Sequence, residues 1–262
     1  MKIFRKIGIV AILFCLPFTT FAWGVNGHRI TGEIAYSYLT PKAKLALKQI
    51  LGNESLAIAG NFADFIRSDD KYAATENWHY MDVDKAMSLP EMKAYLEADT
   101  EVDAYTKMKY LMAELKKKDL PAATRTFDLK MLIHLIEDVH QPMHTAHKDD
   151  KGGNGVKLNW FGKPTNLHTI WDSELINFQQ LSYTEYAASV NYSTATQRAA
   201  WQAAPISTWF FESNQLADKI YSQTKPGDNL SYNYNYQFIG DLNQQLLKGG
   251  VRLAGVLNEM FK

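Results

Sequence analysis

Cysteine is nearly absent from this sequence, in which Cys15 is the only one among 262 residues. It falls within residues 1–22, which have a positively charged start, an apolar run and small residues before Ala22, the pattern of a secretory signal peptide. The alternatives are an uncleaved anchor and a lipoprotein, and Leu13 and Phe14 ahead of Cys15 disfavour the lipoprotein. Cleavage after Ala22 would leave a mature chain without thiols or disulfides, which fits a periplasmic or secreted bacterial protein that is stabilised by packing and by bound metal.

The sequence also lacks an excess of basic residues. It carries 28 basic and 28 acidic residues, and three of the basic ones precede residue 23, so the remaining chain has a net charge of −3. Nothing in the sequence resembles the basic stripe of a duplex-binding protein. If the chain binds nucleic acid, its positive charge must come from something other than lysine and arginine.

Strand patterns are scarce, and most of the chain has apolar residues at helical spacing. The sequence therefore predicts an all-α fold in which residues 23–262 form a single compact multi-helix domain with one short β-hairpin at 156–164. A polar loop is expected at 68–77, and Gly249 and Gly250 are expected to break or kink the last helix. The expected helices are 30–39, 41–52, 56–66, 90–98, 102–117, 127–143, 167–178, 184–190, 194–204, 207–223 and 232–261.

The apolar stretch 129–144 contains two polar residues on what should be a buried helix. His134 and Asp138 are four residues apart and therefore project from one face. Pro142 cannot continue a regular helix, so His144 is expected just beyond a kink. A buried histidine or aspartate is costly when unpaired, whereas a bound metal satisfies both.

The predicted mature N-terminus offers a second set of metal-binding groups. The α-amine of Trp23 has a pKa near 8 as a free terminus, and together with its own carbonyl oxygen it can chelate a metal near neutral pH. His28 follows five residues later, and Gly24 and Gly27 are expected to permit the bend that brings it back. The alternative is an ordinary surface histidine.

Four further residues are candidate ligands. Asp64 lies in an apolar segment, where an ion pair with Arg67 is the alternative reading. His79 lies among aromatic residues, where a hydrogen-bonded core histidine is the alternative. His168 and Asp172 repeat the spacing of the central pair. Imidazole and carboxylate groups without thiolates suit zinc in hydrolytic sites. The remaining histidines, His140 and His147, are interpreted as surface or supporting groups.

Six motifs carry a resemblance to a known family. They are Trp-Gly-x-x-Gly-His, Ala-Asp-x-x-Arg, Trp-His-Tyr-x-Asp, His-x-x-x-Asp-x-x-Gln-Pro-Met-His, Gly-Gly-Asn and Asn-Leu-His-x-x-Trp-Asp, in that order between residues 23 and 172. In these motifs the chain resembles the zinc-dependent single-strand nucleases and 3′-nucleotidases of the mung bean nuclease type. That family and the bacterial zinc-dependent phospholipases C have the same helical fold, which contains a cleft with three zinc ions.

The resemblance implies three Zn²⁺ ions per chain. One would be bound by Asp64, His79, His134 and Asp138. A second would be bound by the Trp23 amine and carbonyl, His28 and Asp138, so that Asp138 bridges the pair. The third would be bound by His144, His168 and Asp172.

The resemblance also implies roles around the substrate. Arg67 and Asp82 match positions near the reacting phosphate, Tyr80 would stack on a base, and Asn154 would help to hold the nucleotide. The implied protein is an exported, monomeric phosphodiesterase without a membrane span, which cleaves single-stranded RNA and DNA to 5′-phosphate products and has 3′-nucleotidase activity.

Two alternatives remain. A phospholipase C is disfavoured by the short Trp23-to-His28 spacing and by an aspartate at 172. A metal-stabilised binding protein without turnover belongs to a different class.

Overall fold

The computed structural model describes residues 23–262, so the predicted signal peptide and its cleavage site lie outside the described residues. Helices dominate these residues, which confirms the all-α prediction. In chain order, the first half of the described chain contains α1 (Val25–Ser37), α2 (Pro41–Leu51), α3 (Leu56–Ala59), α4 (Phe62–Ile66), η1 (Asp70–His79), α5 (Leu89–Ala98), α6 (Ala104–Glu114) and α7 (Ala122–Asp138).

The second half contains shorter turns, a small sheet and the longest helix. Its elements are η2 (Pro142–Thr145), η3 (Lys148–Asp150), β1 (Lys157–Trp160), β2 (Lys163–Asn166), α8 (Leu167–Thr169), η4 (Ile170–Glu174), α9 (Leu175–Phe178), α10 (Tyr183–Val190), α11 (Ala195–Ala203), α12 (Ile206–Ser222), β3 (Asn229–Leu230) and α13 (Tyr232–Met260).

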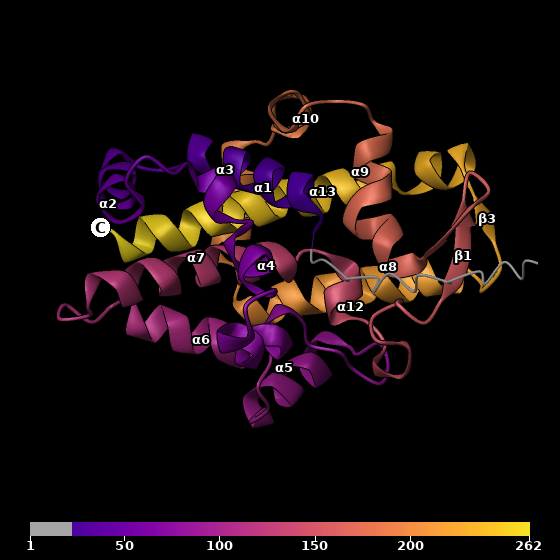
Figure 1. Ribbon diagram of the computed structural model, residues 1–262, viewed down its shortest axis with the longest axis horizontal. Helices are drawn as coiled ribbons and strands as arrows, with labels where there is room; N and C mark the ends of the chain where they lie inside the picture. Colours follow the sequence, from indigo (N-terminus) through magenta and orange to yellow (C-terminus); the bar gives the residue numbers. More distant parts are fainter. Residues whose placement is uncertain (1–22) are drawn as a thin grey trace, which may run out of the picture.

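Helix α13 runs through most of the length of the molecule, with α1 packed along it (Figure 1). The helix is continuous from Tyr232 to Met260, so the break expected at Gly249 and Gly250 was wrong. A Cβ atom at Gly250 would lie 2.5 Å from Cγ2 of Ile34 in α1. Gly250 therefore allows the close approach of the two helices.

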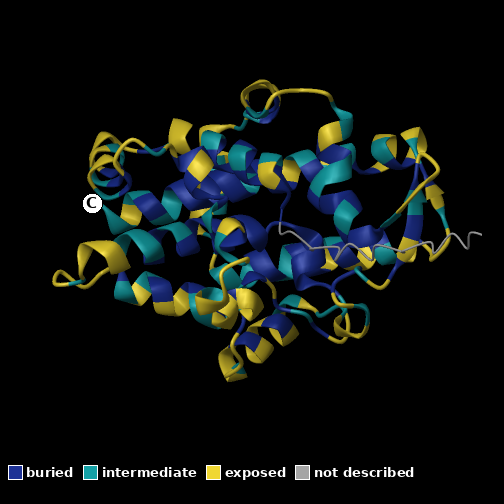
Figure 2. Cartoon of the chain, viewed as in Figure 1, coloured by how far each residue is buried: buried dark blue, intermediate teal, exposed yellow. Residues whose placement is uncertain are grey.

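Helix α7 is the central helix, and its C-terminal half is buried on all sides (Figure 2). It begins at Ala122, after Pro121, and ends at Asp138, so both ends of the predicted helix 127–143 were wrong. The chain turns after Asp138 and resumes as the 3₁₀ helix η2, which has Pro142 in its first turn and contains His144. The proline thus stops the helix as expected and places His144 beyond the turn.

Local sequence explains several helix boundaries. Thr40 caps α2 by accepting a hydrogen bond from the Ala43 amide at 3.2 Å, and Gly52 ends the helix with a φ of 66°, as predicted. The expected helix 56–66 is divided at Gly60 and Asn61 into α3 and α4. The expected polar loop 68–77 is mostly the 3₁₀ helix η1.

The sheet lies at one end of the molecule (Figure 1). Strands β1 and β2 pair antiparallel as the predicted hairpin, with Trp160 opposite Lys163 across a tight turn. A third strand, β3, pairs parallel with β1 over two residues. The sequence did not predict β3, because a two-residue strand has no recognisable alternation.

The core consists of two clusters of buried apolar residues. One surrounds α7 and includes Met108 and Leu135, and the other lies between α1, η4 and α13 and includes Trp171 and Phe238. Tyr38 packs against both clusters. Among residues 23–262, none of the helices combines the length and apolar character that crossing a membrane requires.

The contact between α1 and α13 gives the first prediction. Gly250→Ala should lower the free energy of unfolding by about 1–2 kcal/mol, because the added methyl overpacks the interface with Ile34. Gly240→Ala is the matched control in the same helix, since nothing lies within 4 Å of its Cβ position, and it should stabilise the protein by about 0.5–1 kcal/mol. Chemical denaturation of both variants measures the difference. Equal effects would contradict the close packing.

Candidate metal centre

The centre is built on the last turns of α7. His134 and Asp138 lie one turn apart and are fully buried, and His134 Nε2 is 2.9 Å from Asp138 Oδ2. The prediction that the two residues share one helix face is therefore confirmed. Every other predicted ligand comes from an element that packs around this end of the helix or from the turn that follows it.

His79, the last residue of η1, joins this pair. Its Nδ1 atom lies 2.8 Å from His134 Nε2 and 3.2 Å from Asp138 Oδ2. The three side chains form one of the groups whose donor atoms could hold a metal ion. Asp64 in α4 lies near the same group, with its Oδ1 atom 4.0 Å from His134 Nε2.

His28 lies nearest the other carboxylate oxygen of Asp138. Its Nε2 atom lies 3.6 Å from Asp138 Oδ1 and 3.8 Å from Asp64 Oδ2. A second possible metal-binding group combines His28, Asp64 and His134. The two oxygens of Asp138 thus face different histidines, and Asp64 lies near both His28 and His134.

The route by which His28 reaches this position differs from the predicted one. His28 lies in the first turns of α1, so the tight bend expected at Gly24 and Gly27 is absent. A Cβ atom at Gly27 would lie 2.9 Å from the Trp23 ring, and one at Gly24 would lie 2.1 Å from Ser173 Oγ. Both glycines allow close packing of the N-terminal segment.

The third group contains His144 in η2, His168 in α8 and Asp172 in η4. His168 Nε2 lies 3.2 Å from Asp172 Oδ2, and His144 Nε2 lies 3.9 Å from Asp172 Oδ1. Asp172 is part of a π-helical turn. His144 Nδ1 is also 3.8 Å from Asp138 Oδ2, so this group adjoins the other two.

Trp23 is buried against the same centre. Its indole Nε1 donates a hydrogen bond to the carbonyl oxygen of Glu137 at 2.8 Å. The amide of Gly24 donates to the carbonyl oxygen of Asp172, also at 2.8 Å. Trp23, which would carry the free amine, is therefore held against α7 next to Asp138, and the residue after it is bonded to η4 at Asp172.

The main chain orients three of the histidines. Nδ1 of His134 contacts the carbonyl oxygen of Gly60 at 2.6 Å. Nδ1 of His144 contacts the carbonyl oxygen of His79 at 2.7 Å, and Nδ1 of His168 contacts the carbonyl oxygen of Gly152 at 2.7 Å. Because a carbonyl only accepts, Nδ1 must carry a proton, so the neutral form of each ring has its lone pair on Nε2, where it can bind a metal.

The chemistry of the remaining atoms fits a bound metal. Buried polar atoms normally find hydrogen-bond partners, and several buried atoms of the predicted ligands have none. They are His28 Nε2, both carboxylate oxygens of Asp64, His79 Nε2, Asp138 Oδ1 and His144 Nε2. Metal coordination would satisfy these atoms, so the residues present fit a metal centre.

Electrostatics favours the protonation state that a metal ligand needs at His28, His144 and Asp138. Burial, helped by the charge of His134, lowers the pKa of His28 well below its usual value, and burial lowers the pKa of His144 to about 3. Burial alone would raise the pKa of Asp138, but His134 and His144 outweigh it and hold that pKa well below its usual range. A metal requires neutral imidazoles and ionised carboxylates. Burial lowers the pKa of His134 and of His168, but neighbouring aspartates outweigh it and raise each to about 9, so a metal would displace a proton from both rings.

A cavity of about 840 Å³ opens beside the centre. Its lining includes His79, His144 and His168 together with the four residues predicted to contact substrate, which are Arg67, Tyr80, Asp82 and Asn154. The Arg67 guanidinium lies 3.7 Å from Asp64 Oδ1. Burial raises the pKa of Asp82 to about 7. The side chain of Tyr80 remains 36% exposed, so its ring is accessible from the cavity.

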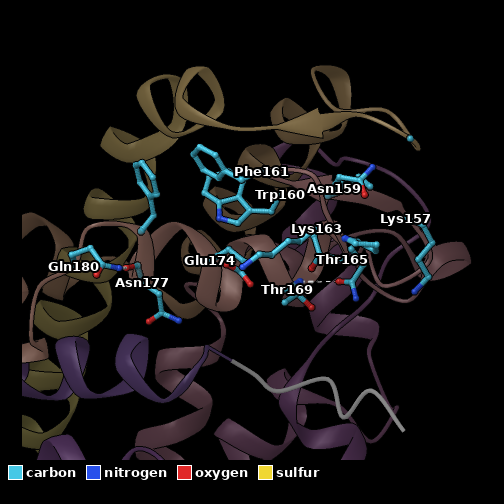
Figure 3. Close-up of a pocket in the computed structure, with 15 residues that line it drawn as sticks. Lys157, Asn159, Trp160, Phe161, Lys163, Thr165, Thr169, Glu174, Asn177 and Gln180 are labelled. Carbon is cyan, nitrogen blue, oxygen red and sulfur yellow. Dashed lines mark hydrogen bonds between the residues drawn. The ribbon is translucent and has the colours of Figure 1, made fainter. Parts of the chain in front are cut away.

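A second cavity, of about 880 Å³, lies at the β-hairpin. Figure 3 shows Trp160 and Phe161 side by side in its wall, with Lys163 and Glu174 along its length. None of the predicted site residues lines it. We therefore do not assign this second cavity as the functional site, although it is as large as the first.

Two buried polar residues contact predicted ligands although the sequence assigned them no role. Gln141 Nε2 donates a hydrogen bond to Asp172 Oδ1 at 2.5 Å, and Glu137 Oε2 lies 2.7 Å from His28 Nδ1. The available signal was their position in the apolar stretch 129–144. His140 is buried against Arg252, with 3.0 Å between Nε2 and Nη1, and is not a surface group.

The fold and the site define a helical protein with a candidate multinuclear metal centre in an open cleft. The family model described as S1/P1 nuclease matches residues 23–262. The chain therefore belongs to the S1/P1 nuclease family and is a hydrolytic nuclease.

Individual relatives agree with this assignment. Endonuclease 2 of Arabidopsis thaliana is 27% identical over 96% of this chain and 94% of that protein. Nuclease P1 of Penicillium citrinum is 26% identical over 91% and 97%, and nuclease S1 of Aspergillus oryzae is 28% identical over 65% and 60%. The resemblance expected from the motifs is confirmed.

The unpartnered buried atoms give the second prediction. A zinc chelator should lower the melting temperature, because ions that bind only the folded state stabilise it by about 4 kcal/mol at a thousandfold excess over Kd. Differential scanning calorimetry measures the shift, and the same chelator preloaded with zinc is the control. An unchanged melting temperature would contradict the metal centre.

Proposed function

We propose that the chain is a zinc-dependent phosphodiesterase that cleaves single-stranded RNA and DNA to 5′-phosphate products and also acts as a 3′-nucleotidase. We further propose export with cleavage after Ala22, and a monomer in which residues 23–262 form one domain. The observation that carries the proposal is the position of Asp138. Its two oxygens face different histidines beside a cleft that Arg67 and Tyr80 line.

The proposed centre holds three zinc ions. The ligands of the first are Asp64, His79, His134 and Asp138. Those of the second are the Trp23 amine and carbonyl, His28 and Asp138. Those of the third are His144, His168 and Asp172. When bound, zinc would lower the pKa of a water molecule to near neutrality and would stabilise the negative charge on the attacking and leaving oxygens of an in-line displacement at phosphorus.

Arg67 and Asp82 are proposed to act on the phosphate. Arg67 lies in the cleft with its guanidinium 3.7 Å from Asp64, so it stands beside the proposed ligands and can stabilise the charge that grows on the phosphoryl oxygens. Asp82 lines the same cleft, and the rise of its pKa to about 7 by burial lets it hold or release a proton near neutral pH.

Tyr80 and Asn154 are proposed to hold the nucleotide. The Tyr80 hydroxyl donates to Asn77 Oδ1 at 3.0 Å, which fixes the ring at the cavity wall. A base stacked on this ring needs no particular sequence but must be unpaired, which supports a single-strand preference. Asn154 Oδ1 is buried without a partner at the same cavity and can accept a hydrogen bond from a nucleotide.

Charge supports a polyanionic substrate. The chain from residue 23 carries a net charge of −3, so its own side chains do not attract nucleic acid. Three divalent ions would reverse the sign of the net charge and concentrate positive charge in the cleft. Substrate would then be drawn to the centre without a basic surface.

A comparison of substrates tests the proposed function. Zinc-loaded protein should cleave single-stranded RNA and DNA at least about 100-fold faster than the same sequences in a duplex, because stacking on Tyr80 requires an unpaired base. End-labelled oligonucleotides measure both rates and reveal which product carries the phosphate. Faster hydrolysis of phosphatidylcholine would favour the phospholipase, and binding without hydrolysis of any phosphate ester would favour a binding protein.

The proposed N-terminal ligand gives the next prediction. Extra residues ahead of Trp23 convert its amine to an amide, so such a protein should bind two zinc ions in place of three and lose at least about 100-fold in activity. Removing the extension with a protease that leaves Trp23 first is the control and should restore both. Full zinc content and activity before cleavage would rule out the chelate.

A further inference from the structure

Glu137 is an unusual residue in the centre of the fold. It precedes Asp138 in α7 and is fully buried, with 0% of its surface exposed. One carboxylate oxygen, Oε2, lies 2.7 Å from Nδ1 of His28, while the other, Oε1, is buried without a partner. A carboxylate in such surroundings is costly, so its presence in the buried half of α7 requires a compensating role.

Gly60, which lies against the Glu137 side chain, leaves room for its carboxylate. A Cβ atom at Gly60 would lie 2.3 Å from Glu137 Oε2, so only glycine fits there without displacing the side chain. The carbonyl oxygen of the same glycine holds Nδ1 of His134 at 2.6 Å. Gly60 therefore supports one histidine directly and admits the carboxylate that contacts the other.

The two histidines are arranged as a pair. The rings of His28 and His134 stack with centroids 4.2 Å apart and an interplanar angle of 20°. Each ring has its Nδ1 atom held from outside the centre, by Glu137 and by the Gly60 carbonyl respectively. Each Nε2 atom therefore faces inward, where His28 Nε2 lies 3.6 Å from Asp138 Oδ1.

The backbone of Glu137 makes a second contact with the same region. Its carbonyl oxygen accepts the hydrogen bond from Trp23 Nε1 at 2.8 Å. One residue of α7 thus holds both Trp23 and His28, while the next residue, Asp138, faces His28 with a carboxylate oxygen.

We propose that Glu137 is a positioning residue of the metal centre, whose carboxylate accepts a hydrogen bond from Nδ1–H of His28 and directs Nε2 of that ring at the metal. A carboxylate behind a histidine ligand fixes the ring tautomer and makes the ligand more basic. The inference rests on the proposed function, because it takes His28 to be a zinc ligand.

The test is the zinc retained by the mature protein as chelator is increased. Glu137→Met keeps the volume but removes the acceptor, so one of the three zinc ions should leave at a chelator concentration about 10–100-fold lower than in the parent. Glu137→Gln keeps an amide oxygen that can accept from Nδ1–H, so its shift should be less than about tenfold.

Glu212→Met is the matched control. This carboxylate pairs with the buried Arg252 at 2.8 Å and with Lys248 at 3.0 Å, and it contacts none of the proposed ligands. The variant should have a lower melting temperature than the parent. The chelator concentration at which it releases zinc should equal that of the parent. A purely structural role of Glu137 would make its methionine variant behave like this control.

A measurement on the unaltered protein avoids any folding defect. In a long-range ¹H–¹⁵N spectrum of zinc-loaded protein, His28 should be the Nδ1–H tautomer with zinc on Nε2. The opposite tautomer, or equal zinc retention in Glu137→Met and the parent, would overturn the inference. A parent that binds no zinc would instead overturn the proposed function.

Discussion

The whole site depends on the buried carboxylate of Asp138 at the end of α7. One oxygen lies 2.9 Å from His134, the other 3.6 Å from His28, and the same carboxylate is 3.8 Å from His144. Elements far apart in sequence therefore converge on one side chain. An ionised carboxylate cannot remain buried without compensating positive charge, and the surrounding histidines or metal ions bound among them can supply it.

The main chain fixes most of this geometry. Carbonyl oxygens of Gly60, His79 and Gly152 hold the outer nitrogens of three histidines. A Cβ atom at Gly152 would lie 2.3 Å from the carbonyl oxygen of Met143, and the residue has a φ of 61°, so the loop takes a path that favours glycine. Because peptide groups of packed segments cannot rotate freely, the rings are preorganised before any metal binds.

The sequence predicted the candidate ligands and the helical fold better than the paths between them. Helical spacing was enough to place His134 and Asp138 on one face, and Thr40 with Pro41 marked the start of α2. The start of α1 and the role of Gly250 depend on contacts between α1 and α13, which no local pattern contains. Glu137 was missed for the same reason, since its partner His28 lies 109 residues away.

Anomalous diffraction at the zinc edge from crystals of the mature protein tests the central claim most directly. The account predicts three peaks in one cleft, with the Asp138 carboxylate coordinated to two of them and His144, His168 and Asp172 around the third. No zinc peak within coordination distance of Asp138, or a single ion bound away from α7, would contradict it.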